Sequence, residues 1–190
     1  EGTAIAISPN QRDIDKITIK NNNISDSHSL GIQVGGGGYG SHLGDIQILN
    51  NNIRSSNGIS IGAYSWLDKK ANSADLIIHE NFINSSKNAL SFGHSDYFLE
   101  GNIQISNNLF EGNSSSITYS QKTESNINNQ FEISQNVFNN NDSVINLSGL
   151  NPNISNNNFY ETQGYIFENI THNSSFDNNK IISLETENRE

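Results

Sequence analysis

Hydrophobic and polar residues alternate in many short segments along the chain. Turns rich in Ser, Asn and Gly separate these segments, for example residues 54–58 and 139–143. A two-residue period is typical of short β-strands with one buried face. Because no window has the sustained period of an amphipathic helix, the pattern predicts an all-β protein. The clearest alternating segments are residues 17–19, 30–34, 46–48, 59–61, 90–92, 103–105, 117–119, 131–133 and 145–147.

A six-residue motif, Ile/Phe-x-x-Asn-x-Ile/Phe, recurs seven times along the chain. Its starts are separated by 29, 30, 27, 28, 21 and 22 residues, which is more regular than an Asn-rich composition alone would produce. Repeats of this length are the signature of a solenoid, in which each repeat stacks on its neighbour. The Asn residues at the centre of the motif are Asn22, Asn51, Asn81, Asn108, Asn136, Asn157 and Asn179.

A solenoid coil of three short strands and three turns takes roughly 20–30 residues, and neighbouring parallel strands lie about 4.8 Å apart. The motif therefore predicts a single domain over residues 1–190, with about seven coils of 21–30 residues. At this strand spacing, the coils would stack to roughly 30–35 Å. Because Ile would lie over Ile from coil to coil, a hydrophobic fraction of 33% suffices for a narrow core.

The repeated Asn predicts a ladder of side chains inside the solenoid. A carboxamide both donates and accepts hydrogen bonds, so each Asn can bond to its equivalents in the coils above and below. Asn also adopts the left-handed backbone conformation at a sharp corner at low cost. Since a buried, unpaired amide is costly, we expect all seven motif Asn residues to form one ladder. The alternative is a scatter of surface Asn side chains in turns.

On this motif, the chain resembles the right-handed parallel β-helix repeat of the pectin-lyase-like superfamily, from about Thr3 to Leu184. The resemblance implies that the Asn turn joins the second and third strands of each coil. It further implies that the first strands form the floor of a substrate groove; these would contain Ile32, Ile59, Leu90, Ile117 and Ile145. Residues 105–113 and 133–141 also resemble repeats of bacterial surface passenger proteins.

The two ends of the predicted solenoid differ in chemistry. Ile5 and Ile7 begin a segment 27 residues before Ile32, so we expect the chain to begin on a first strand. Since an open stack of strand edges favours pairing, we expect either a segment of a longer protein or a domain capped by something outside the chain. End-to-end or side-by-side self-association is a further prediction. The charged residues 184–190 would oppose strand pairing at the other end.

Composition and charge exclude several classes of function. The chain has no Cys, which excludes a disulfide scaffold, a thiolate metal site and a cysteine nucleophile. Its 10 Lys and Arg residues against 20 Asp and Glu residues give a net charge of −10. Such a chain repels phosphate backbones and anionic lipids, so no nucleic-acid partner is expected. No apolar stretch approaches the about 20 residues of a membrane span, so no membrane insertion is expected.

Long connections follow the predicted first strands of the early coils, at residues 35–44, 62–74, 93–102 and 120–130. Long loops on a rigid scaffold commonly carry binding sites. These loops contain aromatic, His and acidic side chains, which suit the faces and hydroxyls of sugars. The alternative is that the aromatic residues pack their own loops onto the solenoid. The candidate ligand-binding residues are Tyr39, His42, Tyr64, Trp66, His94, Asp96 and Tyr97.

Catalytic and metal sites have weaker signals. His94 and Asp96 are spaced to act as a base and its orienting partner, although a structural His in a polar loop is the alternative. The outward positions of the predicted first strands hold no acid, base or cation: Gln33, Ser60, Ser91, Thr118 and Asn146. No two His residues have a metal-ligand spacing, so no metal and no cofactor is expected, and Ca²⁺ has no loop motif to support it.

The leading hypothesis is an extracellular or cell-surface segment that recognises a polysaccharide or other glycan along its long-loop edge. An adhesin-like or carbohydrate-binding role fits this description. The alternative that the family resemblance implies is a polysaccharide lyase or glycoside hydrolase. A third hypothesis is a structural spacer or fibre segment whose loops bind nothing.

Overall fold

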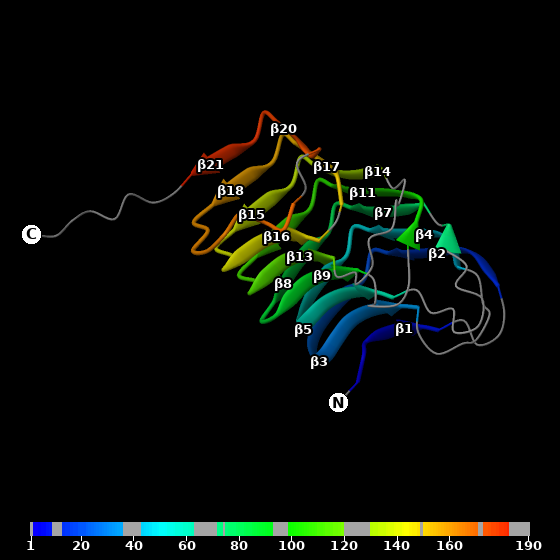
Figure 1. Ribbon diagram of the computed structural model, residues 1–190. Helices are drawn as coiled ribbons and strands as arrows, with labels where there is room; N and C mark the ends of the chain where they lie inside the picture. Colours follow the sequence, from blue (N-terminus) through cyan, green and yellow to red (C-terminus); the bar gives the residue numbers. More distant parts are fainter. Residues whose placement is uncertain are drawn as a thin grey trace, which may run out of the picture.

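The computed structural model describes residues 2–8, 13–35, 43–62, 72–73, 75–92, 99–119, 130–148, 150–170 and 173–182. Every regular element in these residues is a β-strand. The strands pair in parallel with their equivalents in the next coil, and Figure 1 shows them side by side in successive tiers. This confirms the prediction of an all-β solenoid. Within the described ranges, no helix has the length and apolar character needed to cross a membrane.

Each pass of the chain contributes strands to three faces. The second-strand face is a seven-stranded sheet, and in it Ile17 lies beside Ile46 and Ile103 beside Phe131. A strand therefore has its equivalent as its neighbour, as the repeat predicts. The strands of this face are β2 (Ile14–Lys20), β4 (Leu43–Leu49), β7 (Leu76–His79), β11 (Asn102–Ser106), β14 (Gln130–Ser134), β17 (Pro152–Ser155) and β20 (Ser175–Asp177).

The first-strand and third-strand faces belong to one 12-stranded sheet, because the long strands β3 (Asn23–Val34) and β5 (Asn52–Ile61) contribute to both. The first-strand face also contains β1 (Ile5–Ile7), β9 (Asn88–Phe92), β13 (Ser115–Tyr119), β16 (Ser143–Leu147) and β19 (Phe167–Glu168). The third-strand face also contains β8 (Phe82–Ser85), β12 (Leu109–Glu111), β15 (Val137–Asn139), β18 (Asn158–Tyr160) and β21 (Lys180–Ile182).

Not every coil is built in the same way. Four consecutive coils, β7–β9, β11–β13, β14–β16 and β17–β19, contain three separate strands each. The structure thus has about four complete coils, fewer than the about seven that the repeat predicts. In the two preceding coils, β3 and β5 run through the corner between the third and first faces without a break. They do so because they pair with each other across that corner, where Ser27 lies beside Ser55 with a shift of register on either side.

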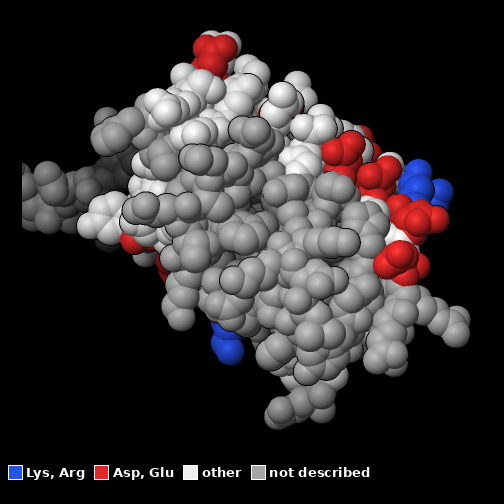
Figure 2. Space-filling view, turned by 45° about the vertical axis from the view of Figure 1, so that its right-hand side comes forward, with Lys and Arg blue, Asp and Glu red and all other residues white. Residues whose placement is uncertain are grey.

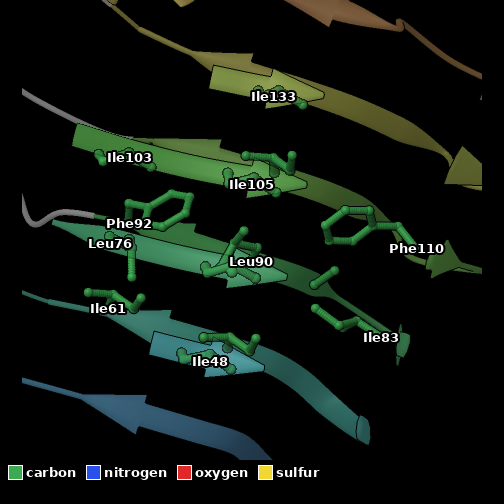
Figure 3. Close-up of a cluster of buried hydrophobic side chains, with 14 of the residues drawn as sticks. Ile48, Ile61, Leu76, Ile83, Leu90, Phe92, Ile103, Ile105, Phe110 and Ile133 are labelled. Carbon is green, nitrogen blue, oxygen red and sulfur yellow. The ribbon is translucent and has the colours of Figure 1, made fainter. Parts of the chain in front are cut away.

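The core is a stack of like side chains. Ile48, Ile105 and Ile133 point into the interior with no exposed surface (Figure 3). Burial of one such side chain stabilises the fold by about 1.5–3 kcal/mol. Further along the same interior, the rings of Phe110 and Phe138 stack at 4.9 Å and 6°, and Phe159 continues the stack at 4.9 Å and 4°. The ring spacing equals the strand spacing, so in-register stacking accounts for the geometry.

The seven motif Asn residues form the predicted ladder. At its centre, Asn108 Nδ2 donates to Asn136 Oδ1 at 3.0 Å, and the Asn108 backbone N–H donates to the same oxygen at 2.9 Å. Asn108 Nδ2 also donates to the carbonyl oxygen of Ile78 at 2.9 Å, which ties it to the preceding coil. From Asn22 to Asn179 every Nδ2–Oδ1 distance between neighbouring rungs is 2.9 or 3.0 Å.

The sharp backbone corner beside the ladder falls one residue earlier than predicted. The expectation that the ladder Asn itself adopts the left-handed conformation is wrong. The preceding residue adopts it, for example Asn107 with φ 56° and Gln135 with φ 58°. This arrangement leaves the ladder Asn with its side chain inward, because the turn is made before it. The equivalent residues are Asn21, Asn50, Glu80, Asn156 and Asn178.

A second, shorter polar ladder lies at the corner between the third and first strands. Asn113 Nδ2 donates to Asn141 Oδ1 at 2.8 Å, and Ser85 Oγ donates to Asn113 Oδ1 at 2.8 Å. All three side chains are buried. The motif does not predict this ladder, because Ser and Asn share its positions and its spacing is visible only once the coils are aligned.

The two ends of the described solenoid confirm one expectation about the chain. β1 pairs with β3 and places Ile5 beside Ile32, so the chain does begin on a first strand. At the other end the interior is open: the side chain of Phe176 is 50% exposed and that of Ile181 60% exposed. The expected self-association of the solenoid stays a prediction.

Candidate functional site

The seven candidate ligand-binding residues of the loops lie outside the described residues: Tyr39, His42, Tyr64, Trp66, His94, Asp96 and Tyr97. The strands that flank these loops are described, and they place the loop ends. The four long connections leave the first-strand face after β3, β5, β9 and β13, and each leads to the second-strand face. Within two of them, β6 (Asn72–Ser73) and β10 (Leu99–Glu100) pair in parallel. The long loops therefore join the solenoid along one edge.

The outward column of the first-strand face has the predicted residues in register. Gln33 lies beside Ser60, Ser60 beside Ser91, and Thr118 lies between Ser91 and Asn146. Two of the hydroxyl groups bond to the sheet itself, since Thr118 Oγ1 donates to the carbonyl oxygen of Leu90 at 3.3 Å and Ser91 Oγ to that of Ile59 at 3.5 Å.

This column continues further than the sequence pattern indicated. Glu168 lies beside Asn146, and Asn146 Nδ2 donates to Glu168 Oε2 at 3.0 Å. The column therefore ends in an acid that sequence reasoning missed, because the last coil lacks a clear alternating segment. One carboxylate hydrogen-bonded to an amide does not provide the pair of carboxyl groups that glycoside hydrolysis uses.

The second-strand face carries a groove that we name the amide groove. It has a volume of about 270 Å³ and crosses the strands β11 and β14 and the start of β17. Most of the side chains in it are carboxamides. Its lining consists of Asn102, Gln104, Gln130, Glu132, Asn151 and Asn153, with Ile103 and Phe131 between them.

The register of the strands sets the geometry of the amide groove. Asn102 lies beside Gln130, and Glu132 lies between Gln104 and Asn153. Residues beside one another on neighbouring parallel strands are about 4.8 Å apart, and residues two apart along a strand about 6.6 Å. The groove is therefore a lattice of two columns that run along the solenoid axis, with one step for each coil.

Hydrogen bonds inside the protein leave part of this lattice free for a ligand. Asn102 Nδ2 donates to Asp75 Oδ1 at 3.1 Å, and Ser134 Oγ donates to Glu132 Oε1 at 3.0 Å. Among the residues that the structure describes, the amides of Gln104 and Gln130 bond to no protein group, and both side chains are exposed. Each of these amides offers donors and an acceptor to solvent.

The electrostatic surroundings of the amide groove are acidic. Glu132 lies in it and Asp75 lies beside Asn102. The only described cations on the second-strand face are Lys16 and Lys20 of β2, which is three strands away from β11. At about 4.8 Å for each strand, they lie beyond the Debye length of about 8 Å at physiological salt. Figure 2 shows acidic side chains gathered at its right-hand edge, with few basic ones beside them.

A Ser–His–Glu cluster lies further along the second-strand face. His79 Nδ1 and Ser106 Oγ are 2.9 Å apart, and His79 Nε2 lies 3.3 Å from Glu80 Oε1. Nucleophilic catalysis also needs donors for an oxyanion. The two backbone N–H groups after Ser106 already make hydrogen bonds. The N–H of Asn107 donates to the carbonyl oxygen of Ser134 at 3.2 Å, and the N–H of Asn108 donates to the Asn ladder. The cluster is therefore a surface hydrogen-bond network.

Metal ligands do not converge in the described part of the chain, where no three His, Asp or Glu side chains form a group that holds a cation. Sequence reasoning placed the candidate site in the loops and missed the amide groove. In the sequence, the outward residues of the second strands look like ordinary polar surface positions. Which of them are neighbours depends on the register between coils, which only the structure shows.

Comparison with protein-family models, with curated proteins and with solved structures gives no match for this chain. What the structure shows is a solenoid of stacked parallel strands, compatible with a β-helix. The resemblance to the pectin-lyase-like superfamily thus rests on the Asn motif and its ladder.

Proposed function

We propose that this solenoid binds a polysaccharide along the edge where the amide groove and the long loops meet. The observation that carries the proposal is the lattice of carboxamides on β11, β14 and the start of β17. Sugar hydroxyls both donate and accept hydrogen bonds, and so do the free amides of Gln104 and Gln130. A rigid strand scaffold fixes the spacing of the residues that carry these groups before a ligand arrives, so the backbone needs no ordering on binding.

The position of the groove supports a chain-like ligand. Gln130 directly follows the connection of residues 120–129, so the groove begins where a long loop rejoins the solenoid. Trp66, Tyr64, Tyr97 and Tyr39 would add flat aromatic faces for stacking on sugar rings, and His42, His94 and Asp96 would add polar contacts. An extracellular or surface location would give such a protein access to polysaccharides.

Affinity electrophoresis in gels that contain a polysaccharide tests this proposal. Gln130→Ala should weaken retardation about fivefold, because one hydrogen bond contributes about 1 kcal/mol. Trp66→Ala should weaken it as well, since stacking of an aromatic ring on the ligand would be lost. The matched control is Gln33→Ala, which removes the same side chain from the first-strand column and should leave retardation unchanged.

Equal mobility of the wild type with and without every polysaccharide tried would contradict the proposal and favour a structural spacer. Release of reducing sugar or of unsaturated product from a retarding polysaccharide would favour the lyase or hydrolase alternative instead. No described residue arrangement favours that alternative, because the amide groove and the first-strand column each contain a single carboxylate, Glu132 and Glu168.

A further inference from the structure

We infer that the polysaccharide bound in the amide groove is uncharged, with hydroxyl groups as its main contacts, and lies along the solenoid axis. This inference rests on the proposed function and adds the class of ligand and its direction. It is carried by the charges, the hydrogen-bond inventory and the register of the groove residues.

The charges around the groove disfavour an acidic polysaccharide. Glu132 is in the groove, and Asp75 continues the column that contains Asn102 and Gln130 by one strand toward the N-terminal end. A uronate polymer along the axis would place carboxylates beside these acids. The described residues near the groove offer no cation to offset the repulsion, since Lys16 and Lys20 lie beyond the Debye length.

The hydrogen-bond inventory favours hydroxyl groups. Asn102 donates one of its two Nδ2 protons to Asp75, and its oxygen accepts no hydrogen bond inside the described protein, whereas Asn153 Oδ1 accepts from Ser175 Oγ at 2.9 Å and its Nδ2 group makes no such bond. Gln104 and Gln130 present both kinds of group, and Glu132 presents an acceptor. A hydroxyl satisfies donors and acceptors alike, whereas a carboxylate only accepts and donates nothing to the groove oxygens.

The register gives the direction of the ligand. A polar side chain returns once for each coil in this column, as Gln104, Glu132 and Asn153, so hydrogen-bonding groups repeat along the axis. Ile77 replaces the amide in β7 and Ser175 replaces it in β20, next to Gln104 and Asn153 respectively. The lattice therefore spans three coils, which suits a few consecutive sugar units of one polymer.

The test uses the intact chain in affinity gels with soluble β-glucan, galactomannan or polygalacturonate, each at low and high salt. We expect retardation by at least one neutral polymer, with equal strength at both salt concentrations. The double variant Gln104→Ala/Gln130→Ala should weaken it about tenfold or more, because two hydrogen bonds are lost. Glu132→Gln should change it less than about threefold, since the amide oxygen still accepts.

Retardation by polygalacturonate alone, weakened by salt and strengthened by Glu132→Gln, would overturn this inference and leave the proposed polysaccharide binding intact. Retardation by none of the polymers would overturn both. Unfolding curves of each variant in urea separate a lost contact from a lost fold, because the substituted side chains are exposed or half-buried and should leave the unfolding midpoint unchanged.

Discussion

The ladder Asn residues show how one side chain organises a coil. Each carboxamide accepts two hydrogen bonds from the preceding rung and donates to the next one, so the ladder has a direction along the axis. Asn51, Asn81, Asn108, Asn136 and Asn157 are at most 2% exposed. At such burial, an unpaired polar group costs about 1–3 kcal/mol, so the ladder contributes to uniqueness of register as well as to stability.

We expect Asn108→Ala to lower the free energy of unfolding by about 3–5 kcal/mol. The substitution removes the acceptor of the Asn81 donors and the side-chain donor to the Ile78 carbonyl oxygen, and it leaves the Asn136 oxygen with only the hydrogen bond from the backbone N–H of residue 108. Urea denaturation followed by circular dichroism measures the change. The control is Asn158→Ala on the outer side of β18, for which we expect a change within about 0.5 kcal/mol. Equal effects of the two substitutions would contradict the ladder's role.

The corner residue before each ladder Asn explains a detail of the sequence. A left-handed backbone is inexpensive for Asn and costs other non-Gly residues about 1–2 kcal/mol. Asn occupies this corner in most coils, while Glu80 and Gln135 occupy it in two. The Asn-Asn pairs of the motif therefore combine two roles, a corner and a rung. Composition alone could not separate these roles, which is why the left-handed position was predicted one residue too late.

At the scale of the strand, the alternating pattern was enough to predict which side chains face inward. Ile17, Ile46, Ile103 and Phe131 are buried in the second-strand face as their spacing predicts. The motif also fixed the register between coils, because Asn must lie over Asn. The amide groove could not be predicted in this way, since Gln104, Glu132 and Asn153 share neither residue type nor spacing within a coil. The loop residues of the predicted site lie outside the described residues, so that part stays a prediction.

A buried Tyr in the first-strand face makes the free energy of unfolding depend on pH in the alkaline range. The side chain of Tyr119 is 2% exposed and lies between Phe92 and Leu147, and this burial raises the pKa of Tyr119 to about 12. The folded state therefore holds the proton more tightly than the unfolded state, in which the pKa is about 10. The stabilisation is complete below about pH 10 and is lost as the pH rises toward 12.

We expect the free energy of unfolding to fall by up to about 3 kcal/mol between about pH 10 and 12 as this group titrates in the unfolded chain. Tyr119→Phe should reduce the pH dependence over this range, whatever its effect at neutral pH. Urea midpoints at several alkaline pH values provide the measurement. Tyr165→Phe is the control, because the side chain of Tyr165 is 74% exposed and the substitution should leave the dependence unchanged. A parallel fall for the wild type and Tyr119→Phe would contradict this explanation.

At the scale of the whole molecule, the same stacking produces the core, the ladders and the amide groove. Register on the first-strand face places Gln33, Ser60 and Ser91 in one column, and register on the second-strand face brings Gln104 beside Glu132. A shift of one residue in a single coil would turn its hydrophobic residues outward and break the groove. The proposed binding of an uncharged polysaccharide therefore depends on the register of β11, β14 and β17.

Disulfide formation between neighbouring coils tests this register most directly, because the chain has no Cys of its own. Gln104 and Glu132 are register partners, so their Cα atoms lie about 4.8 Å apart, within the about 4.4–6.8 Å that a disulfide spans. Gln104 and Asn153 are two coils apart, at about 9.6 Å.

The measurement is the free-thiol content of the oxidised monomer for the variants Gln104→Cys/Glu132→Cys and Gln104→Cys/Asn153→Cys. We predict an intramolecular disulfide in the first variant and two free thiols in the second. Free thiols in the first variant, or a disulfide in the second, would contradict the stacking on which the groove depends.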